Sequence, residues 1–334
     1  MAAQYSFFCR ESRYAFPKIC RIQGAYAIEF AGYIIVFEQL IVFVVLGAVA
    51  QVIPPERRST IFGLVTAAGS FGMFALVPIA QWLLARYGWQ GAFTALAGLV
   101  ALISVLGLGF PTRPKPTPST IAENAGFESL ASVLGKARTH SGYLLLVAGF
   151  FVCGFHVAFI STHMPAYLTD NGISGGVSAT ALSLIGIFNI FGSLIFGRLG
   201  DRYRKKYLLS LLYGVRAVVI ALFLILPLSN TSAILFGGAI GFLWLATVPL
   251  TSGTVAQIFG SRYLSTLYGI VFLGHQLGAF FGVWLGGRVY DSTGSYTTVW
   301  LAAIALGVIA AVIHLPISDQ PYSRTAPAQA TAKA

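Results

Sequence analysis

Three histidines and a glutamine lie within apolar stretches of the sequence, where polar side chains are costly and usually have a function. His156 and His163 are seven residues apart, so in a helix they would lie two turns apart on one face. His275 and Gln276 are neighbours in a second apolar stretch. Because histidine changes its charge near neutral pH, these residues could carry protons or bind a carboxylate. Alternatively, they are neutral histidines that hydrogen-bond between packed helices.

Three further polar or aromatic residues extend this set of candidates. Glu38 lies in the middle of an apolar stretch, and an intramembrane carboxyl group can carry a proton. An internal repeat, described below, pairs Glu38 with Trp244, so both would face a central cavity. Asn189 would either line that cavity or hydrogen-bond two helices together. We expect Arg216, by contrast, to snorkel towards the membrane surface.

Other kinds of site find no support in the sequence. No carboxylate or cysteine accompanies His156 and His163 at ligand spacing, so we predict no metal site. The cysteines at positions 9, 20 and 153 have no paired spacing and indicate no disulfide framework. Neither a His-Glu-x-x-His motif nor a phosphate-binding P-loop occurs. We therefore expect no cofactor, and we treat a membrane-embedded enzyme as the weakest alternative.

The elements that position these residues are predicted to be transmembrane helices. Hydrophobic residues make up 57% of the 334 residues and charged residues only 9%, against roughly 25% charged in soluble domains. The net charge of +11 lies in short loops, where membrane topology explains it without nucleic acid. At about 1.5 Å per residue, nine apolar segments can span a bilayer. They lie at roughly 28–50, 60–84, 91–110, 143–168, 177–199, 207–227, 231–254, 264–288 and 296–315.

A basic, glycine-bearing turn joins two of these segments. Its characteristic residues are Gly197, Gly200, Asp201, Arg202, Lys205 and Lys206. The glycines would let two helices approach closely. Asp201 would sit at the N-terminus of a neighbouring helix, where the helix dipole favours an anion. If this turn is cytoplasmic, most other loop Arg and Lys residues are cytoplasmic too, as the positive-inside rule requires.

Another group of glycines recurs every four residues within one segment. This stripe consists of Gly274, Gly278, Gly282 and Gly286. Small residues at this spacing let two transmembrane helices pack with their backbones close together. The sequence therefore predicts close helix packing along the stripe.

A displacement of 206 residues aligns the two halves of the chain without gaps. It places Ser59 on Ser265, Gly72 on Gly278 and Gly88 on Gly294. Parallel repeats of this kind are typical of secondary transporters, which bind substrates at the repeat interface. The second half has six segments, whereas the first has counterparts of only the last three. We therefore expect an all-α membrane bundle with about nine of twelve helices, lacking the first three.

The sequence divides into five predicted parts. An atypical tail at 1–27 precedes an incomplete N-terminal half at 28–110. A cytoplasmic linker at 111–141 begins with a proline-rich run and should contain a short helix near 121–137, which Thr120 and Glu123 would cap. A six-helix half at 142–317 and a disordered cytoplasmic tail at 318–334 complete the chain.

The turn resembles the signature of the major facilitator superfamily, which has Gly, three residues, Asp-Arg, one residue, then Gly and basic residues. Gly197, Asp201 and Arg202 match, but Arg204 stands where the family usually has Gly. The resemblance implies that the turn is a latch that stabilises one gating state; a plain positive-inside anchor is the alternative.

Within the superfamily, the segments around His156, around His275 and at 291–296 resemble the bacterial monocarboxylate or oxalate/formate-type branch. Carriers of that type hold a carboxylate with a cationic residue in the cavity. The interiors of segments 177–199 and 264–288, which match the usual positions, hold no Lys or Arg.

This resemblance implies a secondary active transporter of a small polar solute in the bacterial inner membrane. The sequence leaves open whether the substrate is a carboxylate, whether transport is coupled to protons, and whether it is symport, antiport or uniport. We expect the site to comprise His156, His163, His275, Gln276, Asn189 and Trp244, with Glu38 as a further candidate. Expected partners are the substrate, protons and membrane lipids. A truncated remnant that does not transport is the alternative for this chain.

Overall fold

A computed structural model of the chain describes residues 45–51, 53–107 and 128–320. The described part consists of helices and the turns between them, and it contains no strand. Glu38 and most of the predicted segment 28–50 lie outside the described residues. The helical fold predicted from the sequence is confirmed in the part that the structure describes.

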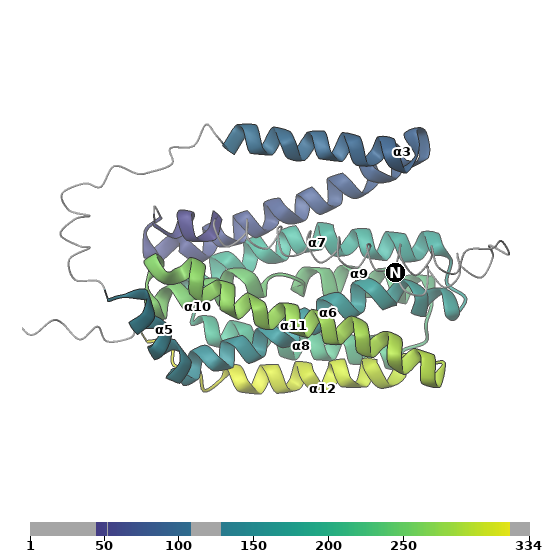
Figure 1. Cartoon of the computed structure of the whole chain (residues 1–334). Helices are drawn as coiled ribbons and strands as arrows, with labels where there is room; N and C mark the ends of the chain where they lie inside the picture. The colour runs from purple at the N-terminus through teal and green to yellow at the C-terminus, as the bar shows by residue number, and fades with distance from the viewer. Residues whose placement is uncertain (1–44, 52, 108–127, 321–334) are drawn as a thin grey trace, which may run out of the picture.

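The second half of the chain forms a bundle whose helices lie side by side (Figure 1). The helices are α6 (Ser141–Asp170), α7 (Gly175–Arg202), α8 (Lys205–Ile225), α9 (Asn230–Leu243), α10 (Thr247–Phe259), α11 (Leu264–Thr293) and α12 (Thr297–His314). Within the described residues, six helical stretches are long and apolar enough to cross a membrane, with α9 and α10 together making one of them. The chain is therefore built as an integral membrane protein.

Glycines bring α6 and α11 together. A side chain at Gly278 would meet the backbone of Phe151, and one at Gly282 would meet the backbone of Phe155. A side chain at Gly286 would meet the imidazole of His163. Backbones can approach this closely only where no Cβ intervenes, so the predicted stripe lies in the α6–α11 interface.

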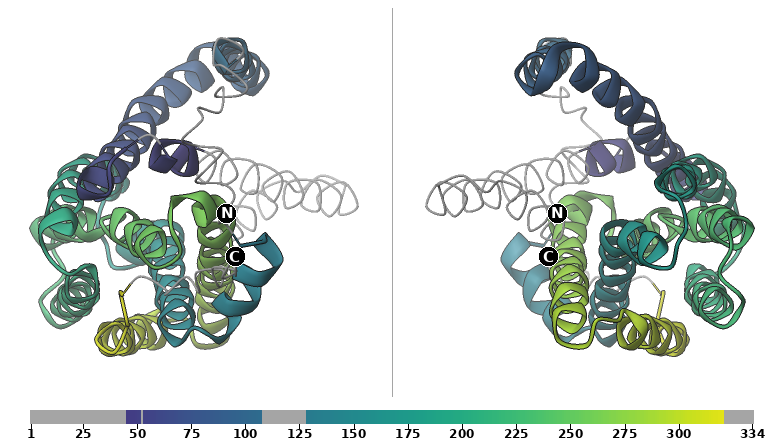
Figure 2. Two further views of the ribbon diagram at one scale, coloured as in Figure 1. Left: turned by 90° about the vertical axis from the view of Figure 1, so that its left-hand side faces the viewer. Right: turned by 90° about the vertical axis from the view of Figure 1, so that its right-hand side faces the viewer.

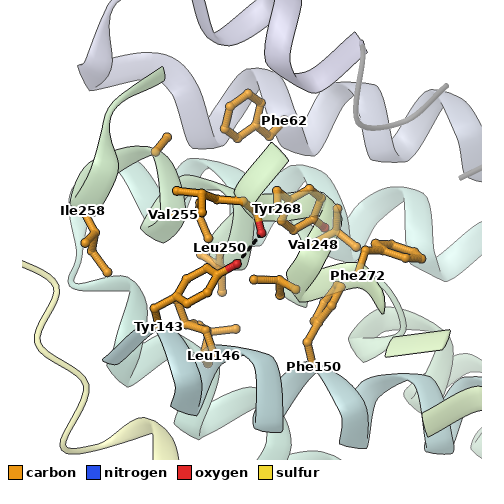
Figure 3. Packing of buried hydrophobic residues seen from close by; sticks show 14 of the residues in the cluster. Phe62, Tyr143, Leu146, Phe150, Val248, Leu250, Val255, Ile258, Tyr268 and Phe272 are labelled. Atoms are coloured by element: carbon orange, nitrogen blue, oxygen red, sulfur yellow. Dashed lines mark hydrogen bonds between the residues drawn. The ribbon is translucent and has the colours of Figure 1, made fainter. Parts of the chain in front are cut away.

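Aromatic and aliphatic side chains fill the space between α6, α10 and α11 (Figure 3). The Tyr143 hydroxyl on α6 donates a hydrogen bond of 2.8 Å to the Leu267 carbonyl oxygen on α11. Phe62 from the first half joins the same cluster and is fully buried. The two halves therefore share one apolar core at this end of the bundle.

Helix α3 (Arg58–Gly107) covers the predicted segment 60–84 and most of the predicted segment 91–110, and it bends at Gly88, where φ is 67°. Its first arm packs along α7, and its second arm stands away from the bundle (Figure 2). The 206-residue repeat recurs here. The 3-10 turns η1 (Pro55–Arg57) and η2 (Ser261–Tyr263) are 206 residues apart, and they precede the starts of α3 and α11.

The linker and the tail differ from the sequence prediction in detail. The linker helix α5 spans Leu130–Thr139, and the Ser129 side chain caps it by accepting a hydrogen bond from the Ser132 amide. Thr120 and Glu123, the expected cap, lie outside the described residues. Asp319 is 3% exposed and fixed to the bundle. The predicted disordered tail from residue 318 therefore starts too early.

Candidate functional site

Asp201 binds the N-terminus of α3. Its Oδ1 accepts a hydrogen bond of 2.8 Å from the Ser59 amide, and its Oδ2 accepts one of 2.9 Å from the Thr60 amide. These amides belong to the first turn of α3, which has no intrahelical acceptors for them. The carboxylate therefore satisfies the helix end and complements its dipole. We call this contact the Asp201 junction.

Two glycines make the Asp201 junction possible. A side chain at Gly197 would meet the Ser59 carbonyl oxygen and the Gly63 Cα, and one at Gly200 would meet the Ser59 side chain. The approach of α7 to α3 thus depends on both glycines, as the sequence suggested. A cavity of about 440 Å³ opens beside the junction, and its lining includes Glu56 and Lys205.

The basic residues of the turn have separate partners. The Lys205 ammonium donates to Gln257 Oε1 at 3.0 Å, and the Lys206 ammonium donates to the Ile317 carbonyl oxygen at 3.0 Å. Arg202 lies with its guanidinium 5.8 Å from the centre of the Tyr203 ring. Lys205 and Lys206 thus bind other protein groups at the bundle end.

Arg204, where the family usually has glycine, forms an ion pair with Asp319. Its Nε and Nη2 donate to the two carboxylate oxygens at 3.2 and 2.6 Å. Hydrogen bonding and the charge of Arg204 lower the pKa of Asp319 below its ordinary value. Sequence analysis missed Asp319, because it lies 115 residues from its partner in a stretch that reads as a polar tail.

Asn189 joins three elements near the middle of the bundle. Its Oδ1 accepts a hydrogen bond of 2.8 Å from the Leu245 amide, and its Nδ2 donates one of 2.6 Å to Ser70 Oγ on α3. Ser193 Oγ also donates to Oδ1, at 3.4 Å. Asn189 is 1% exposed. These contacts favour the role of joining helices over that of lining a cavity.

The expectation that Arg216 snorkels to the surface is wrong. The side chain is 1% exposed and turns inwards from α8. Its Nη2 donates to the Leu243 carbonyl oxygen and, at 2.8 Å, to the Trp244 carbonyl oxygen. Both acceptors lie at the gap between α9 and α10. Free carbonyls at a helix interruption are strong acceptors, and they hold a guanidinium that would otherwise reach the surface.

His156 and His163 each hydrogen-bond a neighbouring helix. His156 Nε2 lies 2.8 Å from the Ala303 carbonyl oxygen on α12, and His163 Nε2 lies 3.0 Å from the Val283 carbonyl oxygen on α11. His156 is fully buried. The geometry favours the packing alternative for both, and proton transfer by them stays a prediction.

His275 lies near the helix interruption, on α11. Its ring packs 4.6 Å from the Phe272 ring centre, and its Nδ1 lies 3.4 Å from Gln276 Oε1. The Cys153 thiol lies beside His275, and its sulfur is 3.3 Å from Thr247 Oγ1. Thr247 starts α10. His275, Trp244, Asn189 and Arg216 are therefore grouped around the interruption, away from His163.

No group of three or more metal-ligating side chains occurs within the described residues. Two of the predicted substrate residues, Trp244 and His275, are buried, with 4% and 7% of their surfaces exposed. In the structure, Asp201 and Asn189 each connect α7 to α3, and α3 is held against α7 at the end of the bundle where Asp201 lies.

The sequence matches the profile of the Major Facilitator Superfamily over residues 35–252. It is 28% identical over 280 residues to an uncharacterized MFS-type transporter, YcxA, of Bacillus subtilis, covering 80% of this chain and 66% of that protein. It is 27% identical over 305 residues to monocarboxylate transporter 12 of Mus musculus, covering 80% of this chain and 63% of that protein.

The fold is similar to a solved structure of the Escherichia coli fucose:proton symporter FucP. The TM-score is 0.62 at 15% identity, and the match covers 81% of this chain and 72% of FucP. The chain spans 63–66% of the length of the two relatives named above.

Proposed function

Because this chain belongs to the Major Facilitator Superfamily, we propose that it is a secondary transporter of a small polar solute that works by alternating access. The comparisons point to a transporter and not to a membrane-embedded enzyme. In alternating access, two halves of a bundle rock about a central site. The Asp201 junction carries the proposal, because it ties the two halves together at one end.

The Asp201 junction is a latch in this proposal. Opening that end requires the α3 amides of Ser59 and Thr60 to leave the carboxylate, which breaks two charge-assisted hydrogen bonds. Such bonds are about twice as strong as neutral ones. The junction therefore stabilises the closed arrangement, and its loss should shift the population towards an open one.

A small carboxylate is the substrate class we propose. The name of the mouse relative supports it. Arg216 supplies an intramembrane positive charge, which segments 177–199 and 264–288 lack in their interiors. We propose protons as the coupled ion, with His275 as the first residue to test. We place the chain in the bacterial inner membrane, following the branch that its sequence resembles.

Uptake into proteoliposomes tests this proposal. We would reconstitute the chain, impose an inward proton gradient and follow labelled formate, acetate, lactate and oxalate. We expect at least one to accumulate above empty liposomes and a protonophore to abolish the accumulation. Asp201→Asn should slow uptake about tenfold or more, because it removes the charge that holds the α3 amides.

Glu56→Gln is the matched control, because it removes an acidic side chain near the same helix start but not the hydrogen bonds to α3. It should transport at the wild-type rate. If no labelled acid enters faster than into empty liposomes, the carboxylate proposal fails. If a wider panel of neutral solutes fails too, the alternative of a chain that does not transport is favoured.

A further inference from the structure

The membrane span made by α9 and α10 is interrupted in the middle of the bundle. α9 ends at Leu243 and α10 begins at Thr247. The residue before α10 is Ala246, whose side chain makes no capping hydrogen bond. An interruption leaves carbonyls and amides without intrahelical partners, and within a membrane the protein itself must satisfy them. Side chains from α7 and α8 do so here.

Arg216 satisfies free carbonyl oxygens at this interruption, and Asn189 satisfies a free amide. Arg216 donates to the carbonyl oxygens of Leu243 and Trp244. Asn189 accepts from the amide of Leu245. The two side chains come from neighbouring helices of the same half, so together they determine the path of the chain through Trp244.

Of these two side chains, Asn189 is the one that also bonds to the other half among the residues that the structure describes. Its Nδ2 donates to Ser70 Oγ on α3. The Ser70 hydroxyl already donates its own proton to the Thr66 carbonyl oxygen at 2.9 Å, so towards Asn189 it can only accept. One amide group therefore carries both the bond to α3 and the bond to the interruption.

We propose that Asn189 is a positioning residue that couples the docking of α3 to the conformation of the interruption at Trp244. When α3 leaves α7, Asn189 Nδ2 loses its acceptor inside the membrane-spanning bundle. An amide without a partner in apolar surroundings is costly, so the side chain turns and the Leu245 amide loses its acceptor as well. Arg216, bonded within its own half, stays in place. The inference rests on the proposed alternating access.

The coupling must act in both directions, because two equilibria of one protein that are linked influence each other equally. If docking of α3 favours the conformation of the interruption seen here, that conformation must favour docking by the same factor. A solute that rearranges the backbone at Trp244 would therefore loosen α3. The closed end of the bundle would open without any contact between the solute and Asp201.

A buried cysteine can report this opening without a known substrate. Ser59 is fully buried at the Asp201 junction, and its hydroxyl has no hydrogen-bond partner among the described residues, so Ser59→Cys removes no bond. This Ser59→Cys reporter would be placed in a Cys9→Ser, Cys20→Ser chain, and the same chain without the reporter gives the background. Labelling by a water-soluble maleimide would be timed in nanodiscs, where both faces are accessible.

Ser70→Ala should raise the labelling rate of the Ser59→Cys reporter several-fold, because it removes the α3 acceptor of Asn189 Nδ2. It also removes the local bond from Ser70 to the Thr66 carbonyl oxygen, which lies within α3. Ser70→Thr keeps a hydroxyl acceptor and should restore the slow rate. Ser193→Ala is the matched control: it removes another hydrogen bond to the same Asn189 side chain but leaves α3 bonded, so its rate should stay unchanged. Asp201→Asn is the positive control for opening.

Tryptophan fluorescence tests whether loss of the bond to α3 changes the conformation at Trp244. The Trp244 signal, obtained by subtracting the spectrum of a Trp244→Phe chain, should shift in Ser70→Ala and not in Ser70→Thr. A purely structural role would lower thermal stability but leave this signal unchanged in the folded fraction.

The outcomes separate the inference from the proposed function. If Asp201→Asn speeds labelling but Ser70→Ala behaves like Ser193→Ala, the coupling is wrong and the latch stands. If neither Asp201→Asn nor Ser70→Ala speeds labelling, both the latch and the coupling fail. Faster labelling in Ser70→Ala with an unshifted Trp244 signal would also overturn the coupling.

Discussion

Helices α3 and α11 begin after 3-10 turns that lie 206 residues apart. Each reaches a glycine with a positive φ, 67° at Gly88 and 68° at Gly294. Phe62 and its repeat counterpart Tyr268 are both fully buried. The two copies are thus alike where each helix starts and where the chain turns.

Their surroundings differ. α11 lies along α6, and its glycine stripe contacts the α6 backbone. The arm of α3 beyond Gly88, which corresponds to α12, leaves Trp89 65% exposed and Phe93 55% exposed and stands apart from the bundle (Figure 2). The comparison teaches that the local sequence determines the starts and turns of these helices, whereas burial depends on the helix beside them.

The largest effect should come from matched glycines in the two copies. A Cβ at Gly278 would meet the Phe151 carbonyl oxygen, whereas one at Gly72 has nothing within 4 Å. Since backbone cannot yield as a side chain does, Gly278→Ala should cost about 3 kcal/mol. Gly72→Ala should stay within about 0.5 kcal/mol of wild type. Thermal unfolding in detergent, followed by size-exclusion chromatography, measures both.

Equal costs at Gly72 and Gly278 would break the comparison, because they would show that α3 is packed as closely as α11. Gly98, on the second arm of α3 and with nothing within 4 Å of an added Cβ, serves as a further control. Its change to Ala should be as mild as that of Gly72.

A smaller effect should separate a second pair, Val299 and its counterpart Phe93. Val299 is 1% exposed, so Val299→Ala removes packed atoms and should cost about 1 kcal/mol. Phe93→Ala removes more atoms but takes them from an exposed surface, so stability should change by less than about 0.5 kcal/mol. Unfolding in lipid nanodiscs would compare the two, and a larger loss for Phe93→Ala would contradict the assigned exposure.

Much of the fold and of the Asp201 junction could be predicted from the sequence, because both depend on local features. Apolar length predicts spans, and a short turn with Gly197, Gly200 and Asp201 predicts a close approach with an anion at a helix end. The family match confirms the resemblance that rested on this turn. The missing first three helices are not shown by any comparison and stay an expectation.

The centre of the bundle could not be predicted in this way. The position of Arg216 near one end of its helix suggested that its side chain would reach the surface. Its side chain points inwards instead, because free carbonyl oxygens of a different span accept hydrogen bonds from it. The sequence left both roles of Asn189 open, because its partners Ser70 and Leu245 lie 119 and 56 residues away. Polar pairs across helices depend on packing, which a single sequence does not specify.

The smallest effect concerns the anchor that follows α12 in the second copy. Because Arg204 lowers the pKa of Asp319, the ion pair should stabilise the bundle above the ordinary carboxyl pKa of about 4. This contribution is lost as pH falls through the lowered pKa of the folded state. Asp319→Asn should therefore reduce the Tm by about 1–2 °C at pH 7 and by progressively less below pH 4.

Salt provides an independent check on this anchor, because Arg204 is half exposed and its attraction to Asp319 is screened. The difference between wild type and Asp319→Asn should shrink in 1 M salt. Arg202→Gln removes a guanidinium that lies over the Tyr203 ring. The Tm difference between wild type and this variant should depend on neither pH nor salt concentration. If Asp319→Asn unfolds like wild type at every pH, the Arg204–Asp319 ion pair contributes nothing to the stability of the second copy, and its packing accounts for the difference between the copies.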